Sequence, residues 1–212
     1  MQQKEISKAV LKRLPGYLSY LKSIQDSASP YISATALANA LGMGEVQVRK
    51  DLAMVSSGGR PKIGYLRESL IEDIEQFLGY DNTTDAILVG AGKLGQALCG
   101  YSGFEAYGLN ILAAFDAAPT TDRTNEGTPI YPMSQLKDFC RANMVLMAII
   151  TVPAEHAQQV CDKLIDCGIK AIWNFAPKHL EVPAGILVQN ENMATSLAVL
   201  SVHLQAQIKE SK

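Results

Sequence analysis

The sequence Gly90-Ala91-Gly92-Lys93-Leu94-Gly95 follows a continuously apolar run at residues 86–89 and has the spacing GxGxxG. Between a strand and a helix, this pattern is typical of dinucleotide-binding domains. The first glycine permits a tight turn, the second lets backbone N–H groups approach a pyrophosphate, and the third allows close helix–strand packing. The N-terminus of the following helix adds positive potential for the anion. All six residues of the turn are therefore candidate cofactor contacts.

Asp116 ends the next apolar run, at residues 111–115, and lies 21 residues after Gly95. A carboxylate at this place can accept hydrogen bonds from the hydroxyls of an adenosine ribose. No arginine follows it directly, which favours NAD(H) over NADP(H). Two alternatives stay open: a glycine turn that binds nothing, and a site for coenzyme A or another nucleotide on the same fold.

Apolar strands and helices alternate along the chain after residue 79. Continuously apolar strands separated by helices indicate an α/β fold, with a doubly wound parallel sheet covered on both faces as in Rossmann-like domains. We expect strands at residues 86–89, 111–115, 144–151, 171–174 and 186–189, and helices at 94–101, 134–141 and 154–167.

Two strand-end loops complete the candidate cofactor site. Doubly wound sheets bind their ligands at the carboxyl ends of the strands. The neutral, partly apolar character of these loops suits an uncharged dihydronicotinamide ring, although they are also compatible with ordinary strand-end loops. The expected contacts are Thr151, Val152, Pro153, Asn174, Phe175 and Ala176.

A dehydrogenase would need a general acid or base beside the nicotinamide. The three histidines, His156, His179 and His203, form no Ser/His/Asp arrangement and no metal-ligand spacing. The segment after Tyr80 also leaves little chain for a substrate domain. We therefore expect no catalytic residue and no metal site, with a small NAD-dependent oxidoreductase as the alternative.

The composition excludes several classes of protein. The chain has 212 residues, of which 48% are hydrophobic and 19% charged, so it can bury a substantial core. No apolar run reaches the ~18 residues of a spanning helix, and the N-terminus has no apolar signal region. The cysteines form no CxxC pair, which indicates buried thiols in a reducing cytoplasm. They are Cys99, Cys140, Cys161 and Cys167.

Charge is distributed unevenly around a net value of −2. Residues 1–67 carry ten lysines and arginines against four aspartates and glutamates, whereas residues 68–212 carry nine against seventeen. A basic N-terminal third suggests a module that binds a polyanion.

The pattern of this basic segment is typical of a winged helix-turn-helix. We expect helices at residues 6–14, 15–26, 34–41, 45–55 and 67–78, with Pro15 opening the second and Ser33 capping the third. The turn Gly42-Met43-Gly44 joins the two short helices, and a basic hairpin at residues 56–62 follows. A small helical oligomerisation domain is the alternative.

In a winged helix, the helix at residues 45–55 enters the major groove. Val48, Leu52 and Val55 should lie on its buried face, with Gln47, Lys50 and Asp51 on the other. We expect Gln47 and Lys50 to reach base edges. We expect phosphate contacts from Arg49, Arg60 and Lys62.

The chain ends in a mostly apolar helix at residues 193–208. Leu197, Leu200 and Leu204 are spaced to pack on a neighbour, which is either the chain's own domain or a second subunit. We thus expect a DNA-binding domain at residues 1–79, a nucleotide-binding domain at 80–190 and a dimerisation segment at 191–212.

Taken together, the sequence resembles the Rex family of redox-sensing transcriptional repressors over nearly its whole length. The matching stretches are 12–14 (KRL), 47–52 (QVRKDL), 64–65 (GY), 89–95 (VGAGKLG), 114–116 (AFD), 151–154 (TVPA), 168–170 (GIK) and 174–177 (NFAP). The resemblance implies a homodimer with swapped C-terminal helices that binds pseudo-palindromic operator DNA. It also implies NADH and NAD+ as ligands, with NADH closing the dimer and releasing the operator.

The resemblance further implies three switch residues, Arg13, Tyr101 and Asn192, with Tyr101 also among the cofactor contacts. Where the family has an aspartate that alternates between a partner tyrosine and the arginine, this chain has Asn192. An amide cannot form the charge-assisted pair. The lost negative charge should favour NAD+ and narrow the discrimination between the two cofactor states, so a DNA-binding dimer with a weakened response is a further alternative. The wing also departs from the family at residues 53–59 (AMVSSGG), which puts the operator preference in doubt.

Overall fold

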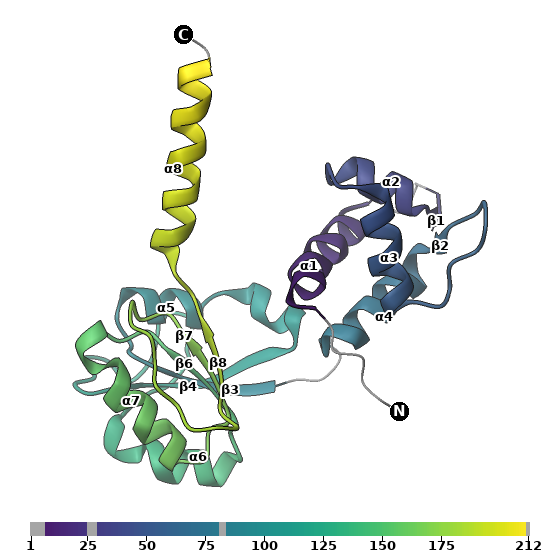
Figure 1. Cartoon of the computed structure of the whole chain (residues 1–212). Coiled ribbons are helices and arrows are strands. Elements are labelled where there is room, and N and C mark those ends of the chain that lie inside the picture. Colours follow the sequence, from purple (N-terminus) through teal and green to yellow (C-terminus); the bar gives the residue numbers. More distant parts are fainter. Residues whose placement is uncertain (1–6, 25–28, 81–83, 211–212) are drawn as a thin grey trace. The chain divides into compact units, whose positions relative to one another are not determined.

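A computed structural model of the protein describes residues 7–24, 29–80 and 84–210. The chain divides into two compact units, Met1–Asn82 and Thr83–Lys212 (Figure 1). The expected boundary after residue 79 lies close to this division, and the role of residues 191–212 stays a prediction. Residues 6, 25 and 26 of the expected first helices lie outside the described residues.

Over its described residues, the N-terminal unit is a bundle of four helices around one apolar core. The helices are α1 (Lys8–Ser23), α2 (Ala34–Ala40), α3 (Glu45–Val55) and α4 (Arg67–Leu78). Leu18 of α1, Leu37 of α2 and Leu52 of α3 are almost fully buried in that core. The Ser33 hydroxyl accepts a hydrogen bond from the N–H of Ala36, which confirms it as the cap of α2.

The expected break at Pro15 is wrong, because α1 runs through it as one helix. Leu14, Leu18 and Leu21 are buried on both sides of the proline, so the apolar face continues across it. Proline has a helical φ, but inside a helix it removes one hydrogen bond and its ring crowds the carbonyl four residues before it. Packing of that continuous face outweighs the loss.

The wing differs from the hairpin expected at residues 56–62. Its paired strands are β1 (Tyr31–Ile32), which precedes α2, and β2 (Tyr65–Leu66), and they run antiparallel. Within the loop itself only an isolated bridge joins Arg60 to Gly64. Gly64 has a φ of +98°, and a Cβ there would lie 2.3 Å from the carbonyl oxygen of Ile32. The close approach of the two strands therefore requires a glycine.

The second unit is built on a six-stranded, fully parallel sheet. The strand order is β5-β4-β3-β6-β7-β8, which is the 3-2-1-4-5-6 order of dinucleotide-binding folds. The sequence missed β5, which has three residues and ends in a proline. The strands are β3 (Thr84–Val89), β4 (Leu109–Asp116), β5 (Ile130–Pro132), β6 (Met147–Ile150), β7 (Ala171–Asn174) and β8 (Leu187–Asn190).

Helices cover both faces of this sheet, as a doubly wound fold requires (Figure 1). Ile87 and Val89 of β3 face the core formed with α6 (Leu136–Asn143) and α7 (Ala154–Asp166). The alternate residues, Ala86 and Leu88, face α5 (Lys93–Cys99) and the 3₁₀ helix η1 (Ser102–Tyr107). A second 3₁₀ turn, η2 (Met133–Gln135), leads into α6.

The last helix, α8 (Met193–Glu210), buries none of its described side chains. Leu197, Leu200 and Leu204 are each more than half exposed. The alternative that these leucines pack on their own domain is therefore wrong for this structure. No helix within the described ranges is long and apolar enough to cross a membrane.

Candidate functional site

The glycine turn lies between β3 and α5, where Gly90 closes it. The N–H of Gly90 donates to the carbonyl oxygen of Phe115, at 2.8 Å, and the Thr151 hydroxyl donates to the carbonyl oxygen of Gly90, at 2.7 Å. A Cβ on Gly95 would lie 2.0 Å from that same carbonyl oxygen. The third glycine therefore permits helix α5 to approach the turn, as its spacing predicts.

Gly92 differs from the other two glycines because it faces open space. A Cβ built on it meets no atom within 4 Å, and its φ of −72° is available to any residue. No packing requirement explains a glycine here. The open space beside its backbone is where the GxGxxG pattern expects a pyrophosphate.

Asp116, at the end of β4, is joined to this turn. One carboxylate oxygen accepts the N–H of Ala91 at 2.8 Å, and the other accepts the N–H of Ala118 at 3.0 Å. Asp116, Ala91 and Gly92 line one cavity of about 220 Å³. The sequence did not single out Gln96, which lines the same cavity and donates from its amide to the carbonyl oxygen of Ala91.

The first strand-end loop meets the glycine turn, whereas the second is held by a buried amide. Thr151 bonds to Gly90 as described, and Val152 lies 3.0 Å from the position of a Cβ on Gly90. Asn174 is fully buried. Its amide donates to Lys178 and Asn190 and accepts from the N–H of Ala176. The Asn174 side chain thus fixes the shape of its loop through hydrogen bonds to other residues of the protein.

Ala176 and Asn192 line a second cavity, of about 240 Å³, together with His179. The Asn192 side-chain oxygen accepts the N–H of Thr195 at 3.1 Å, so this residue caps helix α8. The sequence did not predict this capping role. The neighbouring Glu191 is committed elsewhere, because it accepts from the indole N–H of Trp173 at 2.9 Å.

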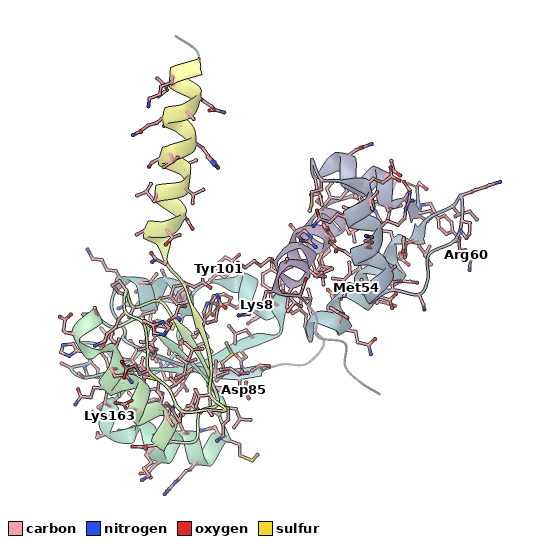
Figure 2. The ribbon with its side chains drawn as sticks, in the orientation of Figure 1. Lys8, Met54, Arg60, Asp85, Tyr101 and Lys163 are labelled. Carbon is pink, nitrogen blue, oxygen red and sulfur yellow. The ribbon has the colours of Figure 1, made fainter. Side chains whose placement is uncertain are left out.

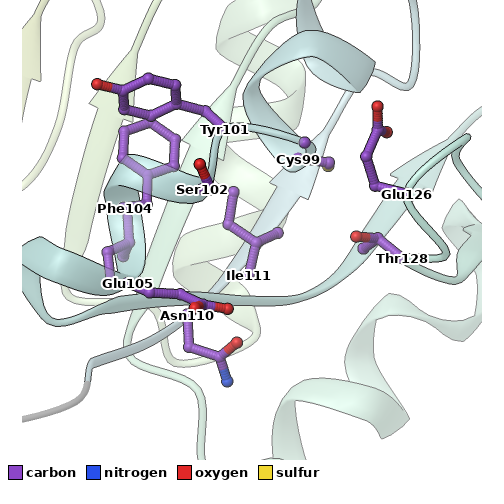
Figure 3. A pocket seen from close by; sticks show the side chains of 11 residues that line it. Cys99, Tyr101, Ser102, Phe104, Glu105, Asn110, Ile111, Glu126 and Thr128 are labelled. Carbon is purple, nitrogen blue, oxygen red and sulfur yellow. The ribbon is translucent and has the colours of Figure 1, made fainter.

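Tyr101 lines a third pocket, of about 390 Å³, at the C-terminal end of α5 (Figure 3). Its ring packs edge-on against Phe104, with centroids 4.9 Å apart, and Glu126 and Cys99 lie at the other end. Burial, reinforced by the Glu126 charge, raises the pKa of the Cys99 thiol to about 11. The sequence did not predict this pocket.

In the N-terminal unit, three predicted phosphate contacts surround one groove. Arg49 of α3 and Arg60 and Lys62 of the wing all line a cavity of about 430 Å³, and Figure 2 shows Arg60 on the wing. Arg49 also forms an ion pair with Glu45 one helical turn before it. Lys50 is exposed on α3, as expected for a base contact.

The prediction that Asp51 lies on the exposed face of α3 is wrong, because its side chain is buried. It lies three residues after Val48 and next to Leu52, so helical geometry turns it towards the core. Arg13 of α1 donates to both of its carboxylate oxygens, at 2.7 and 2.9 Å, and the Tyr17 hydroxyl donates at 2.8 Å. These bonds satisfy the buried charge.

A winged helix with a basic groove and a Rossmann-like sheet with a glycine turn define the architecture of a nucleotide-responsive transcription regulator. Two family models match it: "CoA binding domain" at residues 81–178 and "Putative DNA-binding protein N-terminus" at residues 5–53. Curated relatives at 35–40% identity over most of the chain are redox-sensing transcriptional repressors Rex, so the chain belongs to the Rex family and is a regulator rather than an enzyme.

Full-length relatives carry this assignment. The chain is 40% identical to a redox-sensing transcriptional repressor Rex of Porphyromonas gingivalis, over 92% of this chain and 90% of the relative. It is 38% identical to the Rex of Treponema denticola, over 95% and 96%. Among solved structures, it resembles RSP in complex with β-NAD+ and operator DNA, with a TM-score of 0.89 and 32% identity over 99% and 97% of the chains. The chain also resembles the complex of RSP with β-NADH, with a TM-score of 0.85 over 99% of this chain and 100% of that one.

Proposed function

We propose that this protein is a homodimeric repressor that binds pseudo-palindromic operator DNA and releases it when NADH binds. The observation that carries the proposal is the full-length similarity to RSP, a protein solved with β-NAD+ and operator DNA and also with β-NADH. Similarity over 99% of this chain covers both the winged helix and the nucleotide-binding sheet.

The recognition surface consists of α3 and the wing. Gln47 and Lys50 contact base edges, because they are exposed on the helix that a winged helix inserts into the major groove. Arg49, Arg60 and Lys62 contact phosphates, and the groove that all three line supports this role. Two copies related by a two-fold axis read the two halves of the operator.

The cofactor lies across the glycine turn, with its adenosine ribose at Asp116 and its pyrophosphate at Gly92. The open space beside Gly92 and the cavity at Asp116 support this placement. The nicotinamide lies towards the second strand-end loop and the cavity at Asn192. One matching family model is described as a CoA binding domain. We nevertheless propose NAD(H) as the ligand, because RSP was solved with both NAD+ and NADH.

The exposed leucines of α8 supply the dimer interface. Exposed apolar side chains along a helix indicate a surface that packs on a partner. In a homodimer the α8 helices of the two subunits cover each other's apolar side chains. NADH then acts by population shift, because it binds the closed dimer better than the DNA-competent one. Operator DNA and the NADH pool are both met in the cytoplasm, where we expect the protein to act.

A second candidate function is a DNA-binding dimer with a weakened cofactor response. Asn192 favours it, because a neutral amide at the start of α8 cannot form an ion pair with the Arg13 guanidinium. Within its own unit, Arg13 already has a carboxylate partner in Asp51.

Fluorescence anisotropy separates the two candidates. A labelled pseudo-palindromic promoter fragment is titrated with the protein, and NADH or NAD+ is then added to the complex. Release by NADH at concentrations where NAD+ has no effect supports the redox sensor. Tight binding that responds to neither cofactor supports the second candidate, and no preference for any promoter fragment contradicts both.

A further inference from the structure

We propose that Gln47 reads its base pair as a hydrogen-bond donor only, because Arg13 occupies its amide oxygen. The inference rests on the proposed function and deepens it, since it states which kind of base edge the recognition helix selects. A glutamine in a major groove would otherwise be expected to read adenine.

The contact between the two side chains determines which end of the amide faces inward. One end of the Gln47 amide lies 2.9 Å from Nη1 and 3.2 Å from Nη2 of Arg13. A guanidinium has five N–H donors and no acceptor, so the atom facing it must be the amide oxygen. The amino group of Gln47 consequently points away from Arg13.

Arg13 is itself held in place, so the amide oxygen is not free to turn outward. Its Nε and Nη2 donate to the two carboxylate oxygens of Asp51, and only 4% of the Asp51 side chain is exposed. Tyr17, which is fully buried, donates to the same carboxylate. Releasing the amide oxygen would leave two guanidinium donors without this acceptor, at a cost in free energy.

The hydrogen-bonding capacity of the amide then limits what it can read. An amide oxygen has two lone pairs, and Arg13 supplies a donor for each. Bidentate reading of adenine needs the oxygen to accept from N6 while the amino group donates to N7. Gln47 can offer only the second bond. It therefore selects an acceptor on the base edge, such as N7 of either purine, O6 of guanine or O4 of thymine.

The test starts by locating the base pair that Gln47 reads. Operator fragments with every single base-pair substitution are titrated with the full-length protein and with Gln47→Ala, without cofactor. We expect the alanine variant to lose the preference at one base pair in each half-site and to keep it elsewhere. An unchanged pattern of preferences in Gln47→Ala overturns the inference.

Base analogues at that pair then separate donor-only from bidentate reading. A 7-deazapurine removes the N7 acceptor, a thymine with sulfur in place of O4 weakens that acceptor, and purine in place of adenine removes the N6 amino group. We expect loss of the acceptor to weaken wild-type binding roughly fivefold. We expect loss of the amino group to change it less than twofold. Equal weakening by both changes means bidentate reading of adenine and overturns the inference.

Two variants provide matched controls. Gln47→Glu keeps an oxygen towards Arg13 but has no donor, so it should lose the same preference as Gln47→Ala. Arg13→Lys keeps a positive charge opposite Asp51, but a single ammonium cannot replace the guanidinium fork that spans Asp51 and Gln47, so at least one lone pair of the amide oxygen becomes free. This variant should gain affinity for adenine at the same pair relative to wild type, and an unchanged preference overturns the inference. If wild type prefers no operator sequence, the proposed function fails with it; every other contrary result overturns this inference alone.

Discussion

Arg13 and Asp51 are 38 residues apart in the sequence and form a two-pronged ion pair, with N···O distances of 2.7 and 2.9 Å. The pair joins α1 to α3. Because the Asp51 side chain is almost fully buried, the pair matters mainly through what is left behind when one member is removed.

Asp51→Ala should destabilise the N-terminal unit by about 3 kcal/mol, because it leaves the guanidinium and the Tyr17 hydroxyl without their shared acceptor. Urea unfolding of the full-length protein, followed by circular dichroism, measures the loss. Asp51→Asn keeps one acceptor oxygen and should lose less. A free energy of unfolding unchanged in the alanine variant would contradict this account of the pair.

Stability should fall as the pH rises above 10. Burial, followed by the hydrogen bond to Asp51, raises the pKa of Tyr17 from its usual 10 to about 12. Between these values the unfolded chain releases a proton that the folded chain keeps, so unfolding is favoured. Below pH 10 the ionisation of Tyr17 does not affect the free energy of unfolding. Once the pH exceeds the folded pKa, it has lowered that free energy by about 2–3 kcal/mol.

Tyr17→Phe isolates this effect from that of the thiols. Burial also raises the pKa of Cys140 and Cys161 to about 11, so these groups lower the stability between pH 9 and 11 in both proteins. Urea unfolding at pH 8 to 11.5 should give a shallower decline for Tyr17→Phe above pH 10. Parallel curves would assign the alkaline loss to other groups.

Gly92 and Gly95 should respond in opposite ways to an added side chain. Gly95→Ala places a Cβ 2.0 Å from the carbonyl oxygen of Gly90, so the thermal transition of the nucleotide-binding unit should fall sharply or disappear. Gly92→Val meets open space and should fold, but it should lose NADH affinity at least tenfold by crowding the pyrophosphate. NADH fluorescence titration and thermal melts measure both variants. Full NADH affinity in Gly92→Val would remove the glycine turn from the cofactor site.

Lys50 and Arg60 should affect DNA binding differently. Lys50→Ala should cost ~1–3 kcal/mol at the preferred operator and relax the preference at one base pair. Arg60→Ala should weaken binding about equally on all sequences and reduce the salt slope by about one, as for a phosphate contact. Anisotropy titrations at several salt concentrations on operator and random duplexes compare the two variants. A uniform loss for Lys50→Ala would make it a phosphate contact.

Asn192→Asp should widen the difference between the NADH and NAD+ affinities. An aspartate caps a helix as well as an asparagine does, so α8 is expected to keep its first turn. The added charge should permit a charge-assisted pair with Arg13 in one state of the dimer. Calorimetric titration with both cofactors tests this, with Asn192→Ala as the variant that loses the cap without gaining charge. Equal affinity ratios in Asn192→Asp and wild type would place the switch elsewhere.

Local patterns in the sequence were enough to predict the glycine turn, helix α3 and the covering of both faces of the sheet around β3. Each depends on residues close together in the chain: glycine spacing, an amphipathic stretch that follows a glycine turn, or a continuous apolar run. This also explains the exact agreement for α3, whereas the three-residue strand β5 carried too little pattern to be found.

The sequence by itself therefore determined the class of each domain and the family, because those signals are local and periodic. Only the tertiary structure decided which polar groups are paired. Asp51 is a buried partner of Arg13, which lies 38 residues away in the chain. Asn174 holds its own loop in place through a hydrogen bond to Asn190 on the neighbouring strand. The wing is likewise closed by β1, which lies on the far side of two helices in the sequence. Such contacts join residues that are far apart in the sequence, so no local sequence pattern predicts them.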